Sequence, residues 1–114
     1  MHELGIVFHI IDSLEIVAIE NKLKEIASVT LEVGEVSGVI DSYLKNCWNW
    51  AVKKYDFIKD AKLITVEIPA VTYCQDCNKT YGTVEHGRTC PYCSSERTYL
   101  LTGNEFNIKE IEAC

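Results

Sequence analysis

The segment 74-CQDCNKTYGTVEHGRTCPYC-93 contains four of the six cysteines of this chain, arranged as two Cys-x-x-Cys pairs. Two residues between cysteines allow both thiolates of a pair to bind one ion. Two such pairs supply four sulfurs at ~2.3 Å from the ion in a tetrahedron, a geometry that favours Zn²⁺. Four thiolates leave no open coordination position, so the pattern predicts a structural zinc site rather than a catalytic one. The predicted zinc ligands are Cys74, Cys77, Cys90 and Cys93.

Other interpretations of the cysteine pairs remain open from the residues alone, among them two disulfides or buried free thiols. Iron is the competing ion, because rubredoxin-like electron carriers use two similar pairs. Those proteins usually have glycine after each second cysteine, whereas Asn78 and Ser94 occupy these positions here. A zinc ribbon that binds nucleic acid is another alternative, but it normally has a basic face, and the charged residues of this segment sum to zero. His86 lies between the pairs and is interpreted as an exposed loop residue.

The composition is that of a small globular protein, with 114 residues, 47% hydrophobic residues and a net charge of −6. This charge disfavours non-specific binding to nucleic acid or to an anionic membrane. No apolar run approaches the ~20 residues that span a bilayer, and the N-terminus has no basic flank or cleavage site typical of a signal peptide. We therefore expect a soluble cytoplasmic protein whose cysteines are reduced.

The rest of the chain predicts an α+β fold. Residues 4–20 have a helical apolar stripe, and residues 41–55 contain a second one that Asp41 or Ser42 would cap. Residues 28–37, 62–71 and 106–113 alternate as half-buried strands, with a bulge expected at Gly34. The predicted architecture is a small three-stranded sheet packed with two helices, plus an inserted four-cysteine module similar to a zinc ribbon.

The amino terminus, Met1-His2-Glu3, is a second candidate metal site. The Met1 amine, the backbone nitrogen of His2 and the His2 ring can form fused chelate rings in one plane. Planar nitrogen coordination suits Ni(II) or Cu(II) rather than structural zinc. Glu3 can add a carboxylate oxygen or position the imidazole. His9 lies seven residues after His2, roughly 10 Å along a helix, and is interpreted as an ordinary helix residue.

Four features together resemble the HypA family of nickel-delivery proteins for hydrogenase maturation. They are MHEL at residues 1–4, EVGEVSGV at residues 32–39, the two cysteine pairs and TGNEFNIKEIE at residues 102–112. The resemblance spans nearly the whole chain in the same order. It implies a nickel-binding α/β domain at residues 1–72 and 99–114, with a zinc domain at residues 73–98.

The same resemblance implies the roles of individual residues and the partners. His2 would be the essential nickel ligand, assisted by Glu3 and the terminal backbone nitrogens, including the Met1 amine. Nickel would be a transferable cargo and zinc a structural ion. The implied partners are a HypB-type GTPase, the hydrogenase large subunit and, for some relatives, the urease maturation system; a homodimer is a further candidate assembly. The sequence contains no nucleophile motif or phosphate-binding loop, so we do not expect an enzyme. Cys47 is interpreted as a core residue, and Cys114 is assigned no role.

Overall fold

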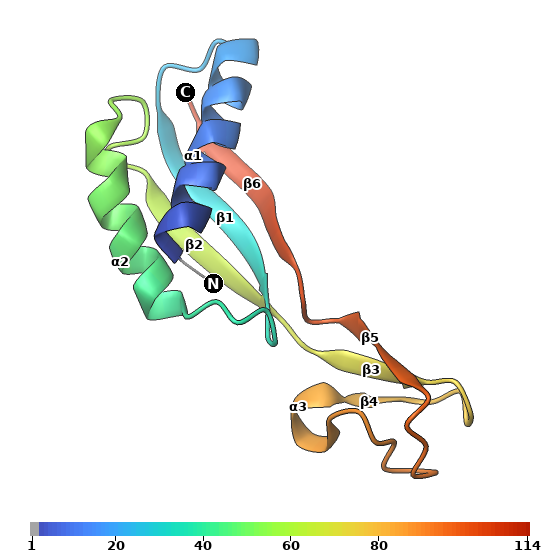
Figure 1. The fold of residues 1–114 in the computed structure, drawn as a ribbon. Coiled ribbons are helices and arrows are strands. Elements are labelled where there is room, and N and C mark those ends of the chain that lie inside the picture. The colour runs from blue at the N-terminus through green and yellow to red at the C-terminus, as the bar shows by residue number, and fades with distance from the viewer. Residues whose placement is uncertain (1–2) are drawn as a thin grey trace. The chain divides into compact units, whose positions relative to one another are not determined.

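The computed structural model describes residues 3–114, and these residues form two compact units (Figure 1). The first unit contains the described residues up to Leu31 together with Gly38–Val66 and Asn107–Cys114, and the second contains Glu32–Ser37 and Glu67–Phe106. In chain order the elements are α1 (Glu3–Glu20), β1 (Ile26–Gly34), α2 (Asp41–Ala51), the short 3-10 helix η1 (Val52–Lys54), β2 (Lys62–Ile68), β3 (Val71–Cys74), β4 (Thr80–Gly82), α3 (Thr83–His86), β5 (Thr98–Thr102) and β6 (Phe106–Ala113).

The first unit is built around two helices that pack side by side (Figure 1). The predicted first helix is confirmed as α1, and its buried residues are Val7, Ile10, Ile11, Leu14 and Ala18. On α2, Trp48 is fully buried, and its indole N–H donates a hydrogen bond of 2.9 Å to the backbone carbonyl of Ala61. A buried indole needs such a partner, so this bond joins α2 to the start of β2.

The start of α2 differs from the prediction. The residue at the N-cap is Ile40, which makes no side-chain capping bond, and Asp41 is already in the first turn. The Asp41 carboxylate instead accepts a hydrogen bond of 2.6 Å from Thr65 Oγ1 and lies 3.2 Å from Lys45 Nζ. The Thr65 hydrogen bond, with a smaller contribution from Lys45, lowers the pKa of Asp41. The carboxylate therefore links α2 to β2 rather than capping the helix.

The sheet of the first unit has the strand order β2-β1-β6, with β1 at the centre. The expected alternation along β1 is wrong, because Ser28, Val29, Thr30 and Leu31 are all buried. Short polar side chains on a central strand are shielded by their neighbours on both sides. The second predicted strand ends early, at Ile68 before Pro69, whereas the last strand is confirmed as β6 over residues 106–113. The α+β class, with three strands, two helices and a four-cysteine module, is confirmed.

The second unit contains an antiparallel sheet with the order β4-β3-β5, which the sequence did not predict. Tyr73 of β3 pairs with Thr80 on one side and with Tyr99 on the other. The register shifts between Val71 and Thr72 against β5. None of the helices within residues 3–114 has the length and apolar character required to cross a membrane.

Candidate metal centre

The four cysteines of the two pairs converge in the second unit. Their Sγ atoms all lie within 4.8 Å of one another. The Sγ atoms of Cys74 and Cys93 are 3.5 Å apart, and those of Cys77 and Cys90 are 3.6 Å apart. Each of these two contacts joins one Cys-x-x-Cys pair to the other. The pairs therefore face each other, as one shared ion requires.

Two similar backbone turns position the thiols. After the first pair, Asn78 N–H donates to the Cys74 carbonyl at 3.0 Å, and Cys74 N–H donates to the Lys79 carbonyl at 2.9 Å. After the second pair, the N–H groups of Ser94 and Cys90 donate in the same way, to the carbonyls of Cys90 and Ser95, at 2.9 Å each. Each turn folds its two thiols toward the same side.

Both turns contain a residue with a left-handed backbone. Asn78 has φ 59° and Ser94 has φ 62°, and each directly follows the second cysteine of its pair. Glycine adopts this conformation without steric cost, and asparagine tolerates it better than most residues. The left-handed turn therefore explains why glycine suits this position in related cysteine knuckles, and why its absence here does not prevent the turn from forming.

Contacts around the cluster hold the turns together. Tyr81 of β4 is buried against Cys74 and Cys90, and its hydroxyl donates to the Gly87 carbonyl at 2.9 Å. Asp76, within the first pair, accepts a hydrogen bond from Ser95 and forms an ion pair of 2.7 Å with Arg97. The bonds of Asp76 therefore connect the first cysteine turn to residues 95–97, which directly follow the second turn. Cys93 is the exposed member of the cluster.

The thiols differ in their acidity. Hydrogen bonds from backbone N–H groups, that of Cys77 first, lower the pKa of Cys74 to about 7. The Ser95 N–H lowers the pKa of Cys93, but desolvation and the neighbouring thiols raise it more strongly, to about 12. Desolvation is the largest cause of the raised pKa of Cys77. Without a cation, Cys74 therefore ionises near neutral pH, whereas Cys77 and Cys93 keep their protons.

The cluster fits a tetrahedral four-thiolate ion. Four sulfurs at ~2.3 Å from one ion are about 3.8 Å from each other, close to the contacts of 3.5 and 3.6 Å seen here. Adjacent thiolates repel one another, which favours the protonated thiols when no ion is bound. A divalent cation would offset this repulsion and so allow the thiols to ionise. Among residues 3–114, these four cysteines are the one group of three or more His, Cys, Asp or Glu side chains close enough to share an ion.

The predicted nickel ligands are only partly within the described residues. Met1 and His2 lie outside them, whereas Glu3 is the first residue of α1 and is half-buried. His9 is exposed on α1. His86 ends α3, lies 3.8 Å from Glu85 and stands edge-on to the Tyr81 ring, and it is not a member of the cysteine cluster. Cys47 is half-buried, rather than a full core residue, and Cys114 is exposed.

Known proteins match this chain along its length. The family model described as hydrogenase/urease nickel incorporation, metallochaperone, hypA matches residues 1–113. The hydrogenase maturation factor HypA of Dehalococcoides mccartyi is 32% identical over 112 residues, which cover 98% of this chain and 93% of the relative. The factor of the same name from Chlorobium phaeobacteroides is 34% identical over 111 residues, which cover 97% of both chains.

Two solved structures have a similar fold. One is the solution structure of the Ni metallochaperone HypA from Helicobacter pylori, with a TM-score of 0.74, 25% identity, and coverage of 99% of this chain and 97% of that one. The other is a solution structure of a HypA protein, with a TM-score of 0.76, 26% identity, and coverage of 100% and 97%. The similarity therefore includes both units.

Proposed function

The chain belongs to the HypA family, whose model describes metallochaperones for nickel incorporation into hydrogenase and urease, and from this premise we propose that it binds Ni(II) at its amino terminus and delivers it for the maturation of nickel–iron hydrogenase. The match over residues 1–113 is the observation that carries the proposal. The fold supports it, because both solved relatives cover nearly the whole chain.

The proposed nickel ligands are the Met1 amine, the backbone nitrogen and ring of His2, and Glu3. Their chemistry supports the assignment, since three nitrogens in fused rings favour the planar geometry of Ni(II). Glu3 directly follows His2 in the sequence, so its carboxylate is a further candidate ligand. His2 must lose its ring proton to bind, so nickel affinity falls as the pH drops through ~6.5.

The proposed resident ion is zinc, held by Cys74, Cys77, Cys90 and Cys93. Four thiolates complete its coordination, so the ion would contribute folding energy and no reaction chemistry. We assign residues 73–98 to this zinc domain and residues 1–72 with 99–114 to the nickel domain. The convergence of the four thiols supports the zinc assignment over paired disulfides, because each thiol has neighbours from both pairs.

The proposed role is transfer rather than catalysis. A planar site at a chain end leaves the ion open to ligands from a partner, so nickel can move by stepwise exchange. The proposed partners are a HypB-type GTPase that works with the chain and the hydrogenase large subunit that receives the ion, with urease maturation proteins as an alternative destination. The cytoplasm is the proposed compartment, because the thiolate site needs reducing conditions.

The test is a nickel titration of the untagged protein. His2→Ala should abolish the stoichiometric nickel site and leave the zinc content unchanged. His9→Ala is the matched control, because it removes an exposed imidazole of α1 and should leave nickel binding intact. Stoichiometric nickel retained by His2→Ala, or X-ray absorption that shows mainly sulfur around the added nickel, would refute the amino-terminal assignment.

A further inference from the structure

The second unit contains a pocket of about 370 Å³ beside its sheet. Thr72 of β3 and Leu100 of β5 are paired across the two strands, so their side chains lie on the same face, and both residues line the pocket. Val36 and Tyr99 add to its apolar wall. Every described residue that lines the pocket belongs to the second unit, so one folded unit forms it. Pockets of roughly 300–1,000 Å³ take small ligands.

Two hydroxyl groups of the pocket have one proton more than the bond between them uses. Thr83 begins α3, and its Oγ1 lies 2.6 Å from Oγ1 of Thr72. Each hydroxyl has one proton to donate, so whichever of the two donates, the other keeps a free O–H. Thr72 is only 3% exposed, and buried polar groups are normally satisfied by a hydrogen-bond partner. An acceptor that enters the pocket can take the remaining proton.

Arg88 gives the pocket a positive charge without a counter-ion. It lines the pocket, and among residues 3–114 its guanidinium has no carboxylate partner. The Thr98 hydroxyl donates to the Arg88 carbonyl at 2.6 Å, which attaches this part of the chain to β5. Glu85, the carboxylate nearest to Arg88 in the sequence, lies 3.8 Å from His86 instead. Among the described residues that line the pocket, none is acidic.

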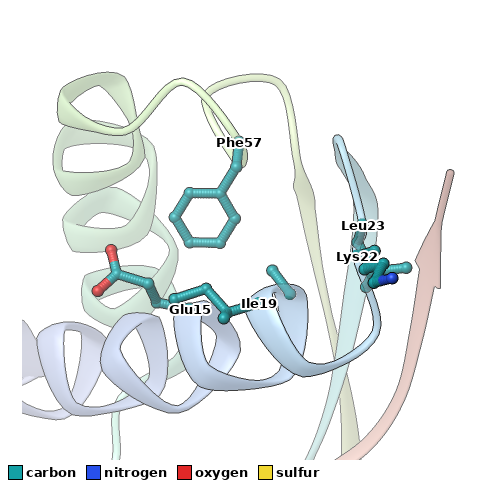
Figure 2. Close-up of a pocket in the computed structure, with 6 residues that line it drawn as sticks. Glu15, Ile19, Lys22, Leu23 and Phe57 are labelled. Carbon is teal, nitrogen blue, oxygen red and sulfur yellow. The ribbon is translucent and has the colours of Figure 1, made fainter.

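The groove beside α1 in the first unit has a different charge pattern. Its volume is about 500 Å³, and both Glu15 and Lys22 line it, on opposite sides of Ile19 (Figure 2). A carboxylate and an ammonium group together do not select a ligand of one sign. The pocket of the second unit offers a guanidinium and a free hydroxyl proton, so it selects a negatively charged acceptor.

We propose that the pocket of the second unit, here called the Arg88 pocket, binds a carboxylate joined to a small aliphatic group. Arg88 pairs with the carboxylate, because its planar fork of N–H donors matches two oxygens. The threonine pair donates its free proton to the ligand, and the aliphatic group packs against Val36 and Leu100. Two sources have this chemistry: the C-terminal residue of a polypeptide and a small free carboxylic acid.

The test is a titration of the isotope-labelled, zinc-loaded full chain, followed by two-dimensional NMR of its backbone amides. The first probe is N-acetyl-leucine, which combines a branched aliphatic group with a chain-terminal carboxylate. We expect saturable shifts of the amide signals of Arg88, Thr98 and Leu100. N-acetyl-leucinamide, the uncharged analogue, should bind about tenfold more weakly, because it forms no charge-assisted hydrogen bond with two ionised partners.

A second acid distinguishes the two sources of the ligand. The compound 4-methylpentanoate is N-acetyl-leucine without its acetylamino group. Tighter binding of N-acetyl-leucine supports the Arg88 pocket as a site for the end of a polypeptide, whereas tighter binding of 4-methylpentanoate supports it as a site for a small free acid.

Three variants locate the ligand in the Arg88 pocket. Arg88→Gln removes the positive charge and should weaken the binding of N-acetyl-leucine about tenfold. Leu100→Glu places a carboxylate on the pocket wall and should abolish saturable binding. Leu101→Glu is the matched control, because it makes the same change at the next residue of β5, which is 47% exposed and does not line this pocket, and it should leave binding unchanged. The amide spectrum of each variant also shows whether the fold is intact.

Three results would overturn the proposal: neither acid produces saturable shifts, the uncharged amide binds as tightly as the acid, or the Arg88→Gln and Leu100→Glu variants bind like the parent chain. None of these measurements involves residues 1–3 or added nickel, so the Arg88 pocket and the nickel site fail or succeed separately.

Discussion

Gly34 lies directly against Gly103, so closely that a Cβ atom on Gly34 would stand 2.1 Å from the Gly103 carbonyl oxygen. Gly103 itself has φ 110° and lies against Ala70, where its own Cβ would stand 2.4 Å from the Ala70 Cα. Val36 N–H donates to the Gly103 carbonyl at 2.8 Å, and Gly34 N–H donates to the Glu105 carbonyl at 2.7 Å. Glycine is therefore required at both positions by close approach of the backbones.

Gly34→Ala should destabilise the protein strongly. The added methyl group meets backbone atoms that cannot rotate away, so we expect a loss near the upper end of the roughly 1–3 kcal/mol that overpacking costs. Urea unfolding followed by circular dichroism measures the change. Gly5→Ala is the control, because its Cβ meets nothing within 4 Å and alanine favours a helix by about 1 kcal/mol over glycine. Equal stability of the Gly34→Ala variant and the parent chain would contradict this packing.

Removal of any single thiol of the cluster should abolish binding of the proposed structural zinc. Cys74→Ser and Cys90→Ser remove buried members of the cluster, and we expect purified protein that has lost most of its zinc and the order of β3, β4 and β5. Metal analysis and amide hydrogen exchange measure the two effects. Cys47→Ser, outside the cluster, should retain zinc at the level of the parent chain. Full zinc content in the Cys74→Ser variant would exclude a four-thiolate site.

The parts of the fold that could be predicted are those whose pattern repeats over many residues. Five residues of α1 are buried at helical spacing, and β6 alternates half-buried and exposed residues over its first half, residues 106–109, so both elements were located from sequence. The strands β3, β4 and β5 contain only four, three and five residues. They are too short for alternation to identify them, and their order depends on the turns around the cysteines.

In the candidate metal centre, too, only some features could be predicted from the sequence. Cysteine spacing was enough to indicate a shared ion, because ligand identity and separation are local properties. The left-handed backbones of Asn78 and Ser94 were not predicted, although their place after each second cysteine was the available signal. The hydrogen bond from Thr65 to Asp41 joins residues that lie 24 positions apart in the sequence. A helix cap was predicted for Asp41 instead, because capping preferences depend only on the residues next to the helix start.

Zinc binding should release protons from the thiols, and the number of protons released per zinc ion should be larger at acidic pH. Cys77 has a raised pKa and that of Cys93 is about 12, so both are protonated at neutral pH before the ion binds. The pKa of Cys74 is lowered to about 7, so below this pH its thiol also carries a proton that zinc must displace. Zinc affinity should therefore fall as the pH drops, and more steeply below pH 7.

Calorimetry in buffers of different ionisation enthalpy counts the released protons. The count per zinc should increase when the pH is lowered through about 7, because Cys74 changes from thiolate to thiol in the metal-free chain. His86→Ala is the control, since His86 is not in the cluster, and it should leave the count unchanged. A count that does not vary with pH would contradict the assigned acidity of Cys74.

Trp48→Phe should destabilise the first unit even though the ring remains aromatic. The substitution removes the indole N–H, so the Ala61 carbonyl loses a donor at 2.9 Å in a buried site. An unsatisfied buried acceptor costs about 1–3 kcal/mol, and the smaller ring adds a cavity to this loss. Trp50→Phe changes an indole that is 56% exposed and should shift the urea midpoint much less. If both variants unfold at the same urea concentration, the bond between α2 and the start of β2 does not stabilise the unit.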